Sequence, residues 1–201
     1  LKPQDLETHW DWQRHLPSPG FTQVDFERRV DYDRLRTYRL ARARQALKNS
    51  ECGALLLFDV NNIRYVSSTK IGEWERDKMS RFCLLVADEE PIVWDFGSAA
   101  VHHRLSCDWL NPENCKPGML GLRGTVPPAV GLMKAHADEL MDLLRKAGVA
   151  DMPVGVDYAE TAMFFELQKA GMEIVDGQQI MLSAREIKNQ DELIILNQAA
   201  A

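Results

Sequence analysis

Two hydrophobic periods alternate along this chain, one typical of helices and the other typical of buried strands. Apolar residues recur at helical spacing from about residue 33 to 48, as Leu40, Ala43 and Leu47. This spacing predicts an amphipathic helix, because residues three and four apart share one helical face. A second stretch with the same period runs from residue 130 to 147 and predicts a second helix, which Gly148 would end.

Continuous apolar runs predict strands that are covered on both faces. Residues 54–58 form one such run, and residues 82–86 and 92–96 form two more on either side of the charged turn 88–91. The pair predicts a hairpin. The helices before residue 54 and after residue 130 would supply the covering layers. The sequence therefore predicts an α/β fold with a mixed central sheet and helices on both of its faces.

The first predicted helix carries six cationic side chains, for which we expect a solvated face rather than a phosphate site. They are Arg34, Arg36, Arg39, Arg42, Arg44 and Lys48. We expect Asp33 to cap this helix and Gly53 to end it. Asp31 and Asp33 resemble a pair of metal ligands, but the helix dipole already favours carboxylates at a helix start.

The segment from Asn61 to Thr69 follows the first buried strand. We expect that strand to leave the core at Asp59, turn at the two asparagines and re-enter at residues 63–66, before a charged loop that contains Trp74. Loops at strand ends often build binding surfaces. The alternative is an ordinary strand-turn-strand with a solvated loop.

Residues 154–175 predict a strand-helix-strand unit. Asp157 and Glu160 have the spacing of a capping box, so we expect the helix to start at Asp157; a pair of carboxylates could also serve acid–base chemistry, but the cap explains both. A last helix starts in the same way at Asn189, with Glu192, and has no stop signal before the chain ends. This pattern is typical of a fragment of a longer protein.

Two segments lack regular patterns. Residues 107–128 are rich in glycine and proline, and their glycine spacing lacks the Lys-Ser/Thr ending of a phosphate loop. Residues 1–31 form an extension in which two tryptophans and two phenylalanines are spaced among prolines and a glycine. We expect this arm to lie over its own domain or a partner subunit, with Trp10 and Trp12 lining a pocket as the alternative.

Composition excludes several classes of protein. The 201 residues are 45% hydrophobic and 27% charged, with a formal net charge of −6, which argues against a nucleic-acid or anionic-membrane partner. The chain has no apolar run of membrane-spanning length, and its polar start is not a signal peptide, so we expect a cytoplasmic protein. The cysteines have no CxxC spacing, and we expect reduced thiols, with a Cys107–Cys115 pair as the alternative.

The usual signatures of catalysis are missing from the sequence. His102 and His103 are adjacent and would point to opposite faces of a strand, and no HExxH motif occurs. No serine, cysteine or lysine has the setting of a nucleophile. We therefore expect no catalytic residue and no metal ligand in this segment.

Two motifs do carry a family resemblance. Asn-Ile-Arg-Tyr at residues 62–65 and Arg-x-Ile-Lys-x-x-Asp-Glu at residues 185–192 resemble the amino-terminal half of the creatinase, prolidase and aminopeptidase P family. The resemblance implies a creatinase-like domain at 32–182, after the extension 1–31, with 183–201 as a linker and the start of a catalytic "pita-bread" domain. It further implies a homodimer with a small-molecule substrate and two divalent ions, of iron, zinc or manganese, in that missing domain.

Within this family, the sequence looks most like the branch that contains the bacterial dimethylsulfoniopropionate lyases. The similarity rests on Asn-Ile-Arg-Tyr, the following Ser-Thr, Trp74, an Arg-Phe-x-Cys-Leu strand and a Trp94-Asp95-Phe96 strand. Such enzymes release dimethyl sulfide and acrylate. The loop after Tyr65 and the extension depart from that pattern. A Xaa-Pro peptidase, a related amide or amidine hydrolase, and a non-catalytic binding or dimerising domain are the alternatives.

Four residues are candidates for substrate binding. Arg64 offers a bidentate fork for a carboxylate, with the alternative that it only ties its strand to a nearby acidic residue. Trp74, Trp10 and Trp12 could present aromatic faces to a cationic head group. We expect Trp94, which lies in a predicted strand, to be part of the core instead.

Overall fold

A mixed six-stranded sheet forms the centre of the protein, of which the computed structural model describes residues 30–72, 80–119 and 122–200. The strands are β1 (Ala54–Leu57), β2 (Phe82–Val86), β3 (Ile92–Asp95), β4 (Cys115–Pro117), β5 (Val154–Val156) and β6 (Ile174–Asp176). Their order is β4-β3-β2-β1-β5-β6. The pairs β1–β2 and β2–β3 are antiparallel and the other three pairs are parallel, so Leu55 lies opposite Leu85 on one side and Gly155 on the other.

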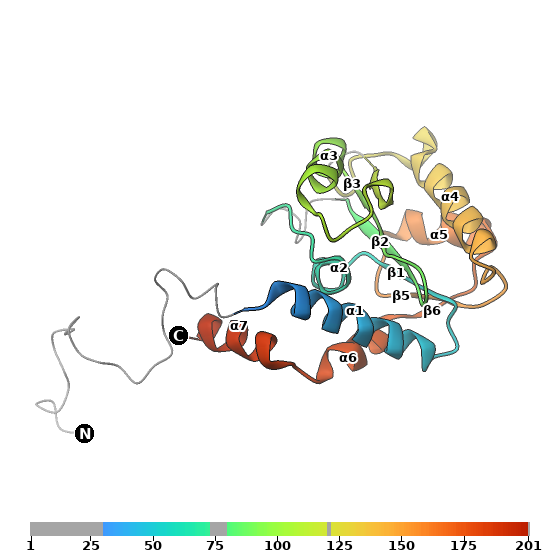
Figure 1. The fold of residues 1–201 in the computed structure, drawn as a ribbon. Coiled ribbons are helices and arrows are strands. Elements are labelled where there is room, and N and C mark those ends of the chain that lie inside the picture. The colour runs from blue at the N-terminus through green and yellow to red at the C-terminus, as the bar shows by residue number, and fades with distance from the viewer. Residues whose placement is uncertain (1–29, 73–79, 120–121, 201) are drawn as a thin grey trace, which may run out of the picture.

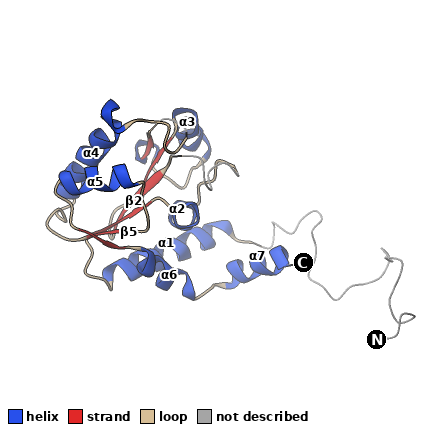
Figure 2. Ribbon diagram, turned by 180° about the vertical axis from the view of Figure 1, so that it is seen from behind, coloured by secondary structure: helices blue, strands red, loops and turns tan. Residues whose placement is uncertain are grey.

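Helices cover both faces of this sheet (Figures 1 and 2). They are α1 (Tyr32–Lys48), α2 (Val60–Ser67), α3 (Gly97–Ser106), α4 (Leu132–Lys146), α5 (Thr161–Lys169), α6 (Gln178–Glu186) and α7 (Gln190–Ala200), with 3₁₀ turns at Pro112–Asn114 and Pro128–Val130. Helices α4 and α5 lie on one face, whereas α1, α2 and α6 lie on the other. This arrangement confirms the predicted α/β architecture. Helix α7 extends away from the sheet beside the start of α1.

The strands separate two hydrophobic cores because successive side chains point to opposite faces. In β1, Leu56 packs in the core under α4 and α5, and Leu55 and Leu57 pack in the core under α1, α2 and α6. Trp94 is fully buried in the first core, stacks on Phe82 at 4.8 Å and donates a hydrogen bond from Nε1 to Glu139. Trp94 is therefore a core residue, as its strand position predicted.

The strand-turn-strand prediction for residues 61–69 is wrong, because these residues belong mostly to helix α2. Asp59 caps the helix by accepting hydrogen bonds from the backbone N–H groups of Asn61 and Asn62. The buried Ile63 and Val66 then lie three residues apart on the face toward the sheet. Ser68 ends the helix in the left-handed conformation. The two asparagines read as a turn in the sequence, but here they form the first helical turn after a good cap.

Helix α1 departs from the prediction in its caps and in the role of its cations. Asp31 is the N-cap, accepting from the backbone of Arg34, and Asn49 rather than Gly53 ends the helix. The cationic face is not simply solvated, because several arginines cross to other elements. Arg34 and Arg39 form ion pairs with α7, and Arg42 donates to backbone carbonyls of α6.

The capping box predicted at Asp157 is also wrong. Helix α5 begins four residues later at Thr161, with Glu160 as its N-cap, and Asp157 instead accepts hydrogen bonds from residues that follow β1. The box predicted at Asn189 is present: the Asn189 side chain accepts from the Glu192 backbone and the Asn189 backbone donates to the Glu192 carboxylate.

Besides α2, two helices and one strand were not predicted. Helix α3 contains His102 and His103, which the sequence had suggested for a strand, and α6 precedes the last helix. Strand β4 lies within the glycine- and proline-rich stretch that was expected to be irregular. Residues 1–29 and 73–79 lie outside the described residues, and with them the arm, Trp10, Trp12 and Trp74.

A buried polar network fixes the end of α2 to the sheet. The side chains of Arg81 and Asp95 are fully buried and form an ion pair at 3.0 Å, and His103 Nε2 lies 3.0 Å from the same Asp95 oxygen. Arg81 also donates to Thr69 Oγ1 at 2.6 Å, and Thr69 contacts Ser67 Oγ at 2.7 Å. Because removing one partner of a buried ion pair leaves an uncompensated charge, this network strongly specifies where α2 ends.

We expect the burial of the α4 face to dominate the stability of the domain. Leu140→Ala should lower the free energy of unfolding by about 2–5 kcal/mol, because the leucine is 1% exposed and its loss leaves a cavity. The same substitution at Leu105, which is 82% exposed, should change it by less than about 0.5 kcal/mol. Urea denaturation followed by circular dichroism measures both, and equal losses would contradict the assignment of the core.

Candidate functional site

Asn62 connects α2 to the end of β5 and to both ends of α6. It is fully buried, and its Nδ2 donates to Asp157 at 3.0 Å and to Gln178 at 2.8 Å. Its Oδ1 accepts from Arg185 Nη1 at 3.0 Å. Since Gln178 and Arg185 lie at the two ends of α6, one amide fixes both the position of α2 and the whole length of α6 beside it.

Asp157 is the acceptor on which these contacts converge. Its two carboxylate oxygens accept from the backbone N–H groups of Phe58 and Asp59, at 2.8 and 3.0 Å, in addition to Asn62. Burial raises the pKa of Asp157, and these donors oppose the shift because they stabilise the charged form. The carboxylate therefore acts as a structural acceptor at the end of β5, and the cap explanation from the sequence does not apply to it.

A close approach of two glycines allows α6 to start directly beside β5. A Cβ atom on Gly177 would lie 2.5 Å from the backbone carbon of Gly155, a distance that side-chain atoms do not tolerate. Gly177 also donates its backbone N–H to the carbonyl of Val156. The glycine pair thus places the first turn of α6 against the sheet and its last turn, with Arg185, beside α2.

Ion pairs attach α7 to α1. Arg34 donates to both oxygens of the buried Asp191 at 2.8 Å, and Arg39 Nε donates to Glu192 at 2.8 Å. The bond from Arg34 is the main reason that the pKa of Asp191 lies below its usual value, and the backbone N–H of Asp31 adds to it. Both charged pairs lie at the start of α7, so this helix is held at its first turn.

A pocket of about 260 Å³ lies where α2, α6, α7 and α1 meet. It is lined by Arg39, Asn61, Arg64, Tyr65, Arg185, Lys188, Glu192, Ile195 and Leu196. The Tyr65 hydroxyl donates to the carbonyl of Ala184, and burial raises the pKa of this phenol, so it stays protonated. Tyr65 thereby forms a fixed neutral wall of the pocket.

The residues that line this pocket carry more positive than negative charge. Its one carboxylate, Glu192, is already paired with Arg39. Arg185 donates to Asn62, and Lys188 donates to the backbone carbonyl of Glu186 at 2.8 Å, so neither meets a carboxylate in the described part of the chain. Arg64 is exposed and forms no ion pair with any described residue. Three cations therefore surround one small cavity, which suits a carboxylate or another compact anion.

Of the four candidate residues from the sequence, the structure places Arg64 in this pocket, and the three tryptophans lie outside the described residues. Asn61, Arg185 and Lys188 were not identified as site residues. If residues 61–65 are read as a helix, Asn61, Arg64 and Tyr65 lie on one face. The strand prediction missed this signal. Arg185 and Lys188 were noticed only as parts of the family motif.

A scan against family models matches residues 39–187 to the Creatinase/Prolidase N-terminal domain. The chain belongs to this family. The matched range covers β1 to β6 and α6, so the creatinase-like domain contains the sheet, both cores and Arg64.

Curated relatives in this family include two dimethylsulfoniopropionate lyases named DddP. The protein from Roseovarius nubinhibens is 26% identical over 176 residues, which is 83% of this chain and 37% of the relative. The protein from Roseobacter denitrificans is 28% identical over 141 residues, which is 69% of this chain and 31% of the relative. The chain thus spans about a third of the length of these relatives.

Solved structures of the creatinase/prolidase family share the fold. An Xaa-Pro dipeptidase from Bacillus anthracis aligns with a TM-score of 0.54 at 14% identity, over 80% of this chain and 38% of the other. A dipeptidase from Pyrococcus horikoshii aligns with a TM-score of 0.50 at 14% identity, over 77% of this chain and 38% of the other. At this identity the similarity concerns the fold alone.

Across residues 30–72, 80–119 and 122–200, His, Cys, Asp and Glu side chains form no group of three or more that could hold an ion. The four cysteines are free and buried, Cys107 and Cys115 included, and burial raises the pKa of each thiol. In the same part of the chain, no helix combines the length and apolarity needed to cross a membrane.

The Arg34–Asp191 pair should make stability depend on pH. Asp191→Asn should lower the free energy of unfolding by about 1–3 kcal/mol at pH 7. Because the pKa of Asp191 is lowered in the folded state, this difference from the wild type should persist above about pH 3.9 and shrink as pH falls further. Urea unfolding between pH 3 and 7 measures it.

Asp142→Asn provides a matched control for that measurement. Asp142 is an exposed partner of Arg145 on α4, and exposed pairs contribute little to stability. A gap between wild type and Asp191→Asn that stays constant to pH 3, or that Asp142→Asn reproduces, would contradict the role assigned to Asp191.

Proposed function

We propose that this domain is the substrate-selecting half of a two-metal enzyme of the creatinase/prolidase family, and that the whole enzyme cleaves dimethylsulfoniopropionate to dimethyl sulfide and acrylate. The metal ions and the bond-breaking groups would belong to a carboxy-terminal catalytic domain, and the active enzyme would be a homodimer. The observation that carries this proposal is the cationic pocket around Arg64, together with the lyase names of the two curated relatives.

The pocket would bind the carboxylate of the substrate. Arg64 is free to form a bidentate pair, whereas Arg185 and Lys188 are each held by one hydrogen bond and supply positive charge from fixed positions. A pre-positioned site loses little side-chain entropy on binding. Such a pocket orients one end of a small substrate, so that its other end reaches the catalytic domain.

The opposite end of dimethylsulfoniopropionate is a sulfonium cation without hydrogen-bond donors. Aromatic faces attract such a cation by about 0.5–2 kcal/mol each. Trp74, Trp10 and Trp12 stay our candidates for this contact. The metal ions would provide Lewis-acid chemistry in the catalytic domain.

An Xaa-Pro dipeptidase is the second candidate. A dipeptide also ends in a carboxylate, so the same three cations would serve it, and tryptophans can pack against a proline ring. The fold similarity to the Bacillus anthracis dipeptidase agrees with this alternative. The two candidates differ in the reaction and not in the pocket, so they must be separated by assay.

The assay incubates the full-length, metal-loaded enzyme with dimethylsulfoniopropionate and, separately, with Xaa-Pro dipeptides. We expect dimethyl sulfide, detected by gas chromatography, and no release of proline. Release of proline without dimethyl sulfide would overturn the lyase and favour the dipeptidase. Activity on neither substrate would contradict both.

A variant of Arg64 tests the pocket itself. Arg64→Ala should raise KM by about tenfold or more, because a hydrogen bond to a charged group contributes about 1.5–3 kcal/mol. Arg145→Ala removes an equal charge from exposed α4 and should leave kcat and KM unchanged. Wild-type kinetics of Arg64→Ala on every carboxylate substrate would remove Arg64 from the site.

A further inference from the structure

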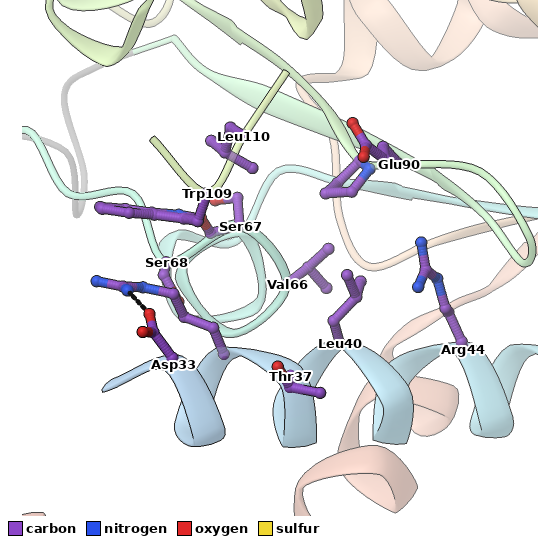
Figure 3. A pocket seen from close by; sticks show the side chains of 12 residues that line it. Asp33, Thr37, Leu40, Arg44, Val66, Ser67, Ser68, Glu90, Trp109 and Leu110 are labelled. Carbon is purple, nitrogen blue, oxygen red and sulfur yellow. Dashed lines mark hydrogen bonds and ion pairs between the residues drawn. The ribbon is translucent and has the colours of Figure 1, made fainter. Parts of the chain in front are cut away.

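A second and larger pocket lies on the other side of α2, away from Arg64. Its volume is about 390 Å³, within the range of small-molecule sites. Its walls come from α1, the end of α2, the β2–β3 turn and the loop after α3. Figure 3 shows an apolar middle, formed by Leu40 and Val66, between a charged end at Arg44 and Glu90 and an aromatic end at Trp109.

The aromatic end is a rigid wall that is already neutralised. Arg36 lies over the Trp109 ring at 3.7 Å and pairs with Asp33 at 2.8 Å. The Trp109 indole donates to the backbone carbonyl of Ser67 at 2.9 Å. The ion pair balances the charges of Asp33 and Arg36, and the Arg36 Nε–H, like that of Arg44, is buried without an acceptor among the described residues. This end therefore offers a ligand mainly the surface of packed side chains.

The charged end is different, because its two charges are not paired with each other. Arg44 donates from Nη2 to the backbone carbonyl of Glu89 at 2.7 Å, which fixes the guanidinium. Its Nε–H is buried and has no hydrogen-bond acceptor among the described residues. Glu90, next in the chain, is exposed and forms no ion pair in the described structure. The Arg44 guanidinium therefore faces no carboxylate in the described structure, and a carboxylate on a ligand would supply one.

We propose that this pocket binds a free α-amino acid with an apolar side chain. The carboxylate of the ligand pairs with the Arg44 guanidinium, and its ammonium group lies beside the Glu90 carboxylate. The side chain of the ligand covers Leu40 and Val66 and points toward Trp109. One cation and one anion that form no ion pair in the described structure thus lie at the same end of the pocket, and an apolar body lies between that end and the aromatic wall.

Charge balance separates this ligand class from simpler ones. The charges of the four charged residues of the pocket, Asp33, Arg36, Arg44 and Glu90, sum to zero. A ligand with a net negative charge would be repelled by Glu90, and a ligand with a net positive charge would be repelled by Arg44. A zwitterion meets both charges favourably. The cationic pocket around Arg64 lacks this balance, which makes the two pockets suited to different ligands.

Isothermal titration of the full-length protein with L-leucine tests the proposal. We expect a single leucine to bind per chain. The two isosteres that each lack one charge, 4-methylpentanoate and 3-methylbutylamine, should each bind at least about tenfold more weakly. Absence of leucine binding, or equal affinity for either isostere, would overturn the proposal.

Variants locate the binding within the protein. Arg44→Met and Glu90→Gln should each weaken leucine binding about tenfold, and Thr37→Phe should abolish it, because Thr37 is an exposed residue of the pocket wall that a phenyl ring would fill. Ala41→Phe, on the exposed side of the same helix, is the matched control and should bind normally.

Arg64→Ala distinguishes this site from the candidate functional site. It should leave leucine affinity unchanged, since Arg64 lies in the other pocket. Leucine binding that survives Thr37→Phe but is lost in Arg64→Ala would place the amino acid in the cationic pocket and overturn the assignment made here.

Discussion

The Asp157 carboxylate is the contact on which the arrangement of this domain depends. It stands at the end of β5 and accepts hydrogen bonds from the backbone where β1 ends and from the buried Asn62 in α2. Through Asn62 the same contacts reach both ends of α6. A parallel strand pair and two helices are therefore fixed by one buried acceptor, whose donors offset the cost of burying it. Because these contacts set the position of α2, they also determine the shape of both pockets beside it.

The spacing of apolar residues over whole elements predicted the fold. The capping and turn signals at element boundaries did not predict where α1, α2 and α5 begin. The apolar runs at residues 54–58, 82–86 and 92–96 became β1, β2 and β3, because continuous burial leaves little alternative for such residues. At Asp59, Asp31 and Asp157 the sequence offered several carboxylates that could each cap a helix, and only tertiary contacts decide among them. Asp157 has the spacing of a cap, yet its donors include Phe58, which directly follows β1 and lies almost a hundred residues earlier in the chain.

The sequence identified Arg64 as a candidate site residue, but it did not identify the neighbours of Arg64 in the pocket. An arginine in a polar segment after a buried strand stands out in the sequence. Arg185 and Lys188 join it only because the contact of Gly155 with Gly177 brings α6 beside α2, and no local pattern encodes that contact. Arg44 and Glu90 are a similar case, since an ordinary helical arginine and an ordinary turn glutamate line the same pocket only when the hairpin packs against α1.

Helix α2 is only eight residues long, and it separates the two pockets. Asn61, Arg64 and Tyr65 face one of them, and Val66, Ser67 and Ser68 face the other. A rotation or shift of so short a helix changes both cavities together, because it has no length over which to absorb the movement. Occupants of the two pockets would consequently share one free energy of coupling, and each would alter the affinity of the other by the same factor.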